Sequence, residues 1–144
     1  MTEPGAIEAT SEERAALRAA RQRLLALHKA LLDRERSRHE HDHGPIQTTQ
    51  QHLQLLMEHP SFAWLRPLSG LIVRIDERLA AKEVVSSGEV RQLAVDARAL
   101  TSFSEERSEY QDRYRGALEG SPVILAAHAD VARALAPLLG PGIR

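Results

Sequence analysis

Residues 65–79 read Leu-Arg-Pro-Leu-Ser-Gly-Leu-Ile-Val-Arg-Ile-Asp-Glu-Arg-Leu and carry the strongest amphipathic pattern in the chain. Their apolar residues recur at spacings of three and four, which places one set on a single side of an α-helix: Leu65, Leu68, Ile72, Ile75 and Leu79. Pro67 stands near the front of this segment. A proline there either kinks the helix or marks its true first turn, after a short turn at residues 62–65.

The segment nearest the N-terminus repeats this pattern over a greater length. Thr10 and Glu13 have the spacing of a capping box, which opens a helix. Five apolar residues then form one stripe: Leu17, Ala20, Leu24, Leu27 and Leu31. We expect this helix to run from about residue 11 to about residue 38, because Gly44-Pro45 is a firm stop soon afterwards.

Four further helices are predicted from capping residues and apolar spacing. They are a short helix opened by Thr48 and Gln51 that ends before Pro60, one opened by Ser86 and Glu89, one carrying Tyr110 and Tyr114 after a break at residues 101–104, and one starting at Ser121 and Pro122. Because every predicted connection is short, sequential helices should pack as antiparallel neighbours.

Composition supports an all-α fold. Helix-forming Ala, Leu, Arg and Glu dominate the 144 residues, and aromatic residues, which favour strands, make up only 3%. We therefore predict an up-and-down helical bundle of about four to six helices. It should form a single domain over residues 1–144, with residues 1–9 and 139–144 frayed.

Charge and residue usage exclude several classes of protein. Nineteen Lys and Arg against 20 Asp and Glu leave a net charge of −1, which gives no general attraction to nucleic acid. The chain has no cysteine, hence no disulfide and no thiolate metal site. The first residues do not resemble a signal peptide, and we see no apolar run of the roughly 20 residues that span a bilayer. We expect a cytoplasmic protein that binds neither nucleic acid nor membrane.

The most conspicuous local motif is Arg-His-Glu-His-Asp-His-Gly at residues 38–44. Imidazoles and carboxylates are good ligands for zinc and nickel, so His39, His41 and His43 are candidate metal ligands, and Glu40, Asp42 or His52 would complete a functional site. If the helix continues, only His39 and His43 share a face; if the chain is extended, all three histidines do. The outcome we expect is a solvated helix end that binds metal only loosely, and a functional metal site is the alternative. Glu40 and His43 also have the Glu-x-x-His spacing of diiron bundles, but the chain has no second copy of that motif.

A second group of candidates is polar. His28 lies between leucines of the first predicted helix, and a buried imidazole needs a hydrogen-bonding partner. Asp33 or Asp76 would supply one, and Arg66 would neutralise a buried acid. This predicted buried polar cluster would form either a proton-handling pocket or a structural contact that fixes the register of the helices.

Two aromatic residues are candidates for an interface. Phe62 and Trp64 follow the short second helix, and exposed Trp and Phe frequently anchor protein interfaces. We expect a homodimer, or a complex with another protein, through Phe62, Trp64 and neighbouring residues of that helix, because a short helix leaves apolar surface uncovered.

Two stretches resemble a group of bacterial helical-bundle proteins that have no established activity. The stretches are residues 27–33, Leu-His-Lys-Ala-Leu-Leu-Asp, and residues 62–77, which begin Phe-Ala-Trp-Leu-Arg-Pro-Leu-Ser. The resemblance covers roughly residues 27 to 135 and implies a helical bundle, but no functional role. That group tends to keep the equivalent of His43 and lacks the full set of three histidines, which counts against a metal site common to the group.

Three functions are compatible with the sequence. The leading hypothesis is a non-enzymatic helical-bundle module that self-associates or binds a protein. The alternative is a metal-handling or metal-sensing bundle that uses residues 39–43. The third is an enzyme with a pocket around His28, Arg66 and Asp76, which is disfavoured because the chain has neither a Gly-x-Ser-x-Gly motif nor a glycine-rich phosphate loop.

Overall fold

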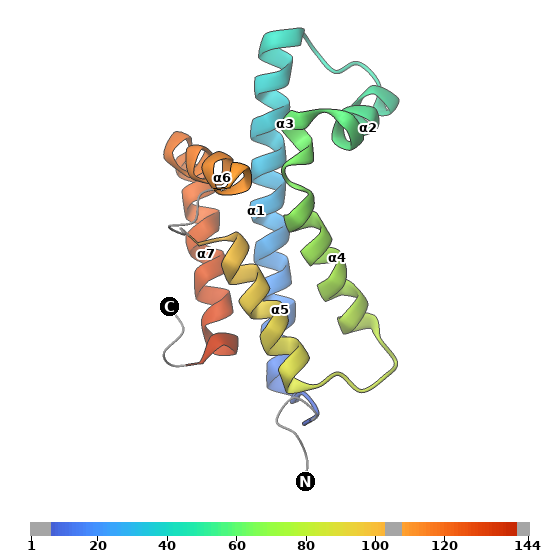
Figure 1. Cartoon of the computed structure of the whole chain (residues 1–144), viewed down its shortest axis with the longest axis vertical. Coiled ribbons are helices and arrows are strands. Elements are labelled where there is room, and N and C mark those ends of the chain that lie inside the picture. The colour runs from blue at the N-terminus through green and yellow to red at the C-terminus, as the bar shows by residue number, and fades with distance from the viewer. Residues whose placement is uncertain (1–6, 103–107, 141–144) are drawn as a thin grey trace.

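The computed structural model describes residues 7–102 and 108–140, and these residues form seven α-helices and no strand (Figure 1). The predicted break at residues 101–104 and the predicted frayed ends lie partly outside this range. The helices are α1 Ser11–His43, α2 Thr49–Glu58, α3 Pro60–Ala63, α4 Arg66–Ala80, α5 Ser87–Leu100, α6 Glu109–Gly120 and α7 Pro122–Leu139.

The predicted all-α helical bundle is confirmed, but the predicted number of four to six helices is wrong for the described residues. The additional helix is α3, a single turn that begins at Pro60 and ends at Ala63. Trp64 and Leu65 separate this turn from α4, whose first turn contains Pro67. Pro67 therefore starts a helix instead of kinking one, because a first-turn residue needs no backbone N–H donor.

Four helices make the body of the bundle. α1 packs against α4, α5 and α7, while α5 packs against both α4 and α7. Figure 1 shows α1 and α5 running in one direction and α4 and α7 running in the other. Along the chain, α2 and α3 form the connection between α1 and α4, and α6 crosses the end of α7. These three helices therefore depart from a simple up-and-down order.

The apolar stripes predicted from the sequence form the core. All five stripe residues of α1, from Leu17 to Leu31, are buried. In the stripe of residues 65–79, Leu79 alone is only partly buried. Fully burying one leucine contributes roughly 2 kcal/mol, so the α1 stripe is a major source of the driving force for folding.

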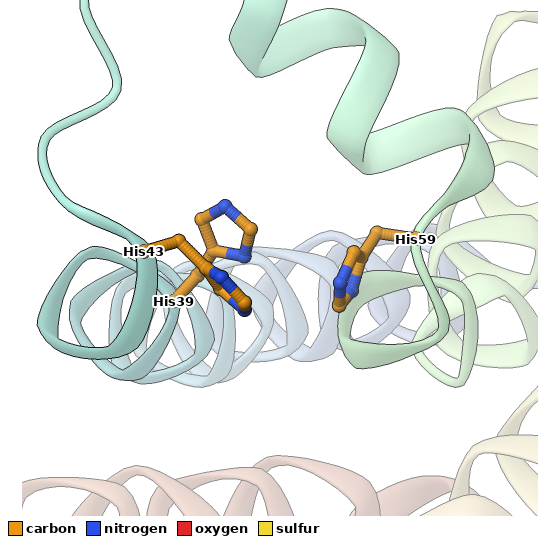
Figure 2. Close-up of side chains that lie close together, drawn as sticks. All are labelled: His39, His43 and His59. Carbon is orange, nitrogen blue, oxygen red and sulfur yellow. The ribbon is translucent and has the colours of Figure 1, made fainter.

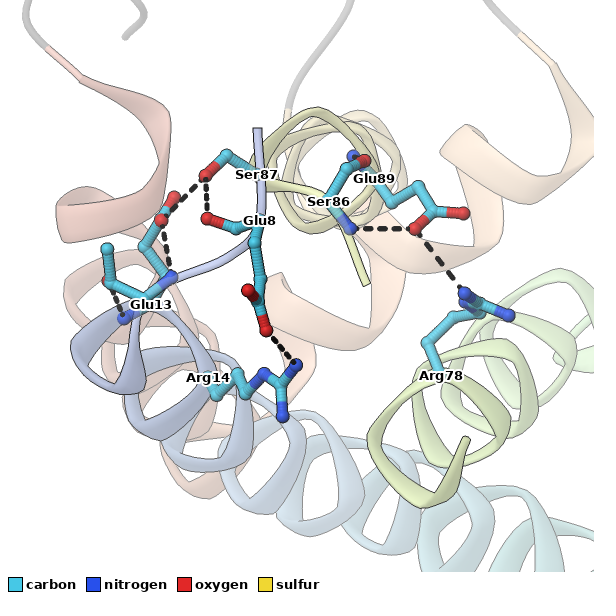
Figure 3. Close-up of polar contacts among 8 residues, drawn as sticks. Glu8, Glu13, Arg14, Arg78, Ser86, Ser87 and Glu89 are labelled. Atoms are coloured by element: carbon cyan, nitrogen blue, oxygen red, sulfur yellow. Dashed lines mark hydrogen bonds and ion pairs between the residues drawn. The ribbon is translucent and has the colours of Figure 1, made fainter. Parts of the chain in front are cut away.

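The beginning of α1 is tied to the beginning of α5 (Figure 3). The carboxylate of Glu13 accepts hydrogen bonds from the backbone N–H of Thr10, at 2.9 Å, and from the hydroxyl of Ser87, at 2.7 Å. Residues 7–9 join the same contact, because the N–H of Ala9 donates to the carbonyl of Val85 at 2.8 Å. The prediction that residues 7–9 fray is wrong, since backbone hydrogen bonds hold them and Ala9 is buried.

α7 ends at Leu139, which is buried against the core although the sequence predicts a frayed end there. Within the described ranges, α7 is also the single helix long and apolar enough to cross a membrane by length and composition. Its residues Ile124, Val131 and Leu135 are buried, and it packs against α1, α5 and α6. Core helices of bundles can be equally long and apolar, so length and composition do not decide the question, and the absence of a membrane span stays a prediction.

We expect Glu13→Ala to lower the free energy of unfolding by about 1 kcal/mol, because it removes the acceptor shared by the α1 cap and Ser87. Urea unfolding followed by circular dichroism measures the change. Glu12→Ala is the matched control, since Glu12 is an exposed first-turn acid of the same helix. Equal unfolding midpoints for the two variants would contradict a linking role for Glu13.

Candidate metal centre

α1 continues five residues further than the sequence predicts, to His43. Gly44 ends it with a φ of 86°, a conformation that favours glycine, and donates its N–H to the carbonyl of Glu40 at 2.8 Å. The predicted end near residue 38 is therefore wrong. Because the helix continues, His39 and His43 lie one turn apart on one face, whereas His41 points elsewhere and is exposed.

A third histidine completes the group on that face. The chain leaves α1 at Gly44, forms α2 and returns to α1 at His59, the residue between α2 and α3. α3 packs against α1, which places the His59 ring opposite the rings of His39 and His43 (Figure 2). We define His39, His43 and His59 as the histidine triad.

The rings of the triad are close enough to share an ion. The His39 ring centroid lies 4.6 Å from that of His43 and 5.1 Å from that of His59, while the His43 and His59 centroids are 6.2 Å apart. One ring nitrogen from each histidine lies within 4.8 Å of the other two. Among the described residues, the triad is the single His, Cys, Asp or Glu group with the geometry to hold a metal.

Burial and neighbouring charge act together on His39. Desolvation lowers the pKa of His39, and the imidazoles of His43 and His59 lower it further, against an opposing effect of Asp42 and Glu40. The Nδ1 atom of His39 is buried and has no hydrogen-bond partner. The lowered pKa favours the neutral imidazole, which is the form that binds a metal.

The triad lies at the wall of an open pocket of about 470 Å³ between the end of α1 and α2. Gln51, Gln54 and Leu55 of α2 line the opposite side, and Glu58 adds a carboxylate near His59. The pocket leaves room for water or a small ligand beside the imidazoles.

The structure thus brings together two of the three predicted ligands and replaces the third. Of the residues proposed to complete the site, Glu40 pairs instead with Arg36, with 2.8 Å between Nε and Oε1. His52 is half-buried and lies outside the triad. The sequence does signal a helix end beside His59, because Pro60 follows it, but no local pattern shows that this end folds back onto α1.

The predicted buried polar cluster does not assemble in the described part of the chain, where no hydrogen bond or ion pair joins any two of its four members. Its charged residues have other partners: Asp76 pairs with Arg21, Asp33 with Lys29 at 2.9 Å, and Arg66 donates to the backbone carbonyl of Met57. Both carboxylate oxygens of Asp76 accept from the Arg21 guanidinium, so the charge of Asp76 is compensated without His28.

Phe62 and Trp64 are buried, with 2% and 7% of their surface exposed, so the prediction that they form an exposed interface is wrong. Phe62 packs beside two members of the triad, with its ring 6.0 Å from His39 and 6.2 Å from His59. Trp64 packs against Tyr110 at 5.5 Å. Both side chains contribute to packing because the helices around them close over the connection between α3 and α4.

The sequence analysis did not find a hydrogen-bonded pair of polar residues formed by a buried tyrosine and a half-buried histidine. The Tyr114 hydroxyl lies 2.7 Å from Nδ1 of His128, and the Tyr114 side chain is fully buried. Burial raises the pKa of Tyr114, and burial followed by the charge of Arg98 lowers the pKa of His128. At neutral pH this partly buried hydrogen bond therefore joins two uncharged groups, which suits a structural role.

His28 gives a prediction about acid stability. The side chain is half-buried, and desolvation lowers the pKa of His28 in the folded state. The unfolded chain therefore binds a proton first as the pH falls below about 6.5, and stability decreases. We expect His28→Gln to reduce the loss of stability between pH 7 and pH 5, measured by urea unfolding at both values.

The matched control is His41→Gln, which removes an exposed imidazole from the same helix. This variant should lose as much stability on acidification as the unmodified protein does. An unchanged loss in His28→Gln would show that burial of His28 has no effect on acid stability. The loss should not vanish in His28→Gln, because the pKa of His128 is lowered too.

Comparison with known proteins finds no matching protein family, no similar curated protein and no similar solved structure. The resemblance to a group of bacterial helical-bundle proteins therefore stays a prediction, and the function has to be inferred from the residues of this chain.

Proposed function

We propose that the protein binds a divalent transition-metal ion, zinc or nickel, through His39, His43 and His59, and handles or senses that metal. The observation that carries the proposal is the convergence of three imidazole nitrogens, within 4.8 Å of one another, from two separate segments of the chain. Three histidines form a ligand set that suits zinc and nickel.

The distances fit a site that tightens when an ion enters. Nitrogens bound to tetrahedral zinc at roughly 2.0–2.1 Å from the ion lie about 3.3 Å from each other. Because the triad nitrogens lie within 4.8 Å of one another, each pair has to close by at most about 1.5 Å. His43 is exposed in the last turn of α1, and His59 lies between two helices, so rotation of these side chains supplies that movement.

The open pocket supports metal handling or sensing in preference to a closed structural site. A structural zinc site uses four protein ligands, whereas three protein ligands leave a position for water or another ligand. The pocket beside the triad contains Glu58, an exposed carboxylate that supplies a fourth ligand if it swings inward. An exchangeable position is what uptake and release of an ion require.

Calorimetric titration of zinc chloride and nickel chloride into tag-free protein tests the proposal. We expect one ion per chain, and we expect His39→Ala, His43→Ala and His59→Asn each to weaken binding by more than about tenfold. His59→Asn is preferred to alanine because asparagine keeps a side chain that caps a helix. Binding should fade below about pH 6, where free imidazoles become protonated.

His41→Ala is the control, since His41 belongs to the same motif but lies outside the triad. Its affinity should stay within about twofold of that of the unmodified protein, because no ligand is lost. If His41→Ala weakened binding as much as His59→Asn, the metal would bind a flexible histidine tract and not the triad.

We infer self-association as a second candidate function, supported by α2. None of the ten residues of α2 is buried, and Leu53 and Met57, four positions apart on one face, are 56% and 62% exposed. Glu58 is the single Asp, Glu, Lys or Arg of α2, so little charge opposes contact with a second copy. Two-fold association is the commonest way to cover such a surface.

For this candidate we expect the double substitution Leu53→Glu and Met57→Glu to convert dimers into monomers, because it places four like charges at the proposed contact. Light scattering at tens of micromolar protein measures the mass. Val73→Glu is the matched control, because Val73 is equally exposed on α4. A monomeric unmodified protein would exclude self-association through α2.

A further inference from the structure

His59 has two structural roles at the joint between α2 and α3. It is the C-cap of α2, where its N–H donates to the carbonyl of Leu55 at 2.9 Å. It is also the N-cap of α3, where its Nδ1 accepts a hydrogen bond from the N–H of Ser61 at 3.1 Å. The His59 side chain therefore fixes how the chain turns from one helix into the next.

The capping contact determines which ring nitrogen carries a proton. A backbone N–H can only donate, so Nδ1 of His59 must be the unprotonated nitrogen while it accepts from Ser61. In a neutral imidazole, the proton then resides on Nε2. The cap thus requires the ring proton on Nε2, whereas a metal bound at Nε2 requires the ring proton on Nδ1.

Metal coordination through either nitrogen removes this cap. If the ion binds Nε2, the ring proton moves to Nδ1, which becomes a donor facing another donor. If the ion binds Nδ1, the lone pair that accepts from Ser61 is used by the metal. In both cases the N–H of Ser61 loses its partner, so the metal and α3 compete for one side chain.

We propose that metal binding at the triad releases the cap of α3 and so reorients α2 at the joint formed by His59. This inference rests on the proposed function, because it needs His59 as a ligand. α2 can respond because none of its residues is buried and it lies beside the four-helix body (Figure 1). The hydrogen bond from Arg66 to the carbonyl of Met57 ties it to α4 near its C-terminal end. Gln51, Gln54 and Leu55 move with α2, so the metal changes the shape of its own pocket.

The cost of releasing the cap is modest. A side-chain N-cap typically changes the equilibrium between the folded and the open helix end by about fivefold. A penalty of that size lowers the affinity for zinc by about fivefold and does not prevent binding. The coupling is reciprocal: the cap weakens metal binding by about fivefold, and bound metal weakens the cap by the same factor.

Nuclear magnetic resonance of the full chain, titrated with zinc chloride, tests the inference. In the metal-free protein, the ring nitrogen shifts of His59 should show an unprotonated Nδ1 and a protonated Nε2. With zinc bound, that pattern should be lost, and the Ser61 amide should exchange with solvent at least about fivefold faster. Amides of α2 should shift, whereas those of α5 should not.

Two variants separate the cap from the metal. His59→Asn keeps a capping side chain, so its Ser61 amide should exchange slowly whether zinc is present or absent. His39→Ala removes a ligand but leaves the cap intact, so zinc concentrations that saturate the unmodified protein should not accelerate exchange at Ser61.

The two possible failures differ in their readout. If calorimetry detects zinc at the triad while the Ser61 amide and the His59 ring pattern stay unchanged, the inference is overturned and metal binding stands. If zinc does not bind at all, both the proposed function and this inference are overturned.

Discussion

Burial of the leucine stripe of α1 is the constraint on which the rest of the structure depends. α4, α5 and α7 all pack on α1, and each covers part of that stripe. The partners are shorter than α1, which has 33 residues and a length of about 50 Å, whereas the 18 residues of α7 span about 27 Å. Beyond Glu35, α1 has no buried residue and projects past the bundle (Figure 1).

The projecting end of α1 explains where the candidate site lies. α2 and α3 occupy the connection between α1 and α4, and α3 packs back on α1 through the buried side chain of Phe62. That contact carries His59 to the face where α1 presents His39 and His43. The triad therefore results from the way the fold covers the end of its longest helix, and the pocket is the space that α2 leaves open.

Local signals in the sequence predict six of the seven described helices but not the site. The capping box at Thr10 and Glu13 and the stripe of α1 were predicted correctly, because both depend on residues a few positions apart. The pairing of Arg21 with Asp76 joins residues 55 positions apart, and no periodicity encodes it. Periodicity also does not encode the position of His59 or the burial of Trp64. The first depends on the packing of α3 on α1, and the second on contact with Tyr110 of α6. The end of α1 was placed too early, although Gly44 was the correct stop.

The choice of capping residue at α3 is itself an argument about function. Wherever else a side chain caps a helix in the described ranges, the residue is serine or threonine: Thr10, Thr48, Ser86, Ser108 and Ser121. Such residues are preferred because a short side-chain oxygen reaches the free N–H groups with little conformational cost. Histidine at position 59 departs from that rule at α3, a one-turn helix. Histidine caps a helix less well than serine does, but it binds metal ions far better. It is therefore the residue expected at a cap whose side chain has to leave the helix to bind an ion.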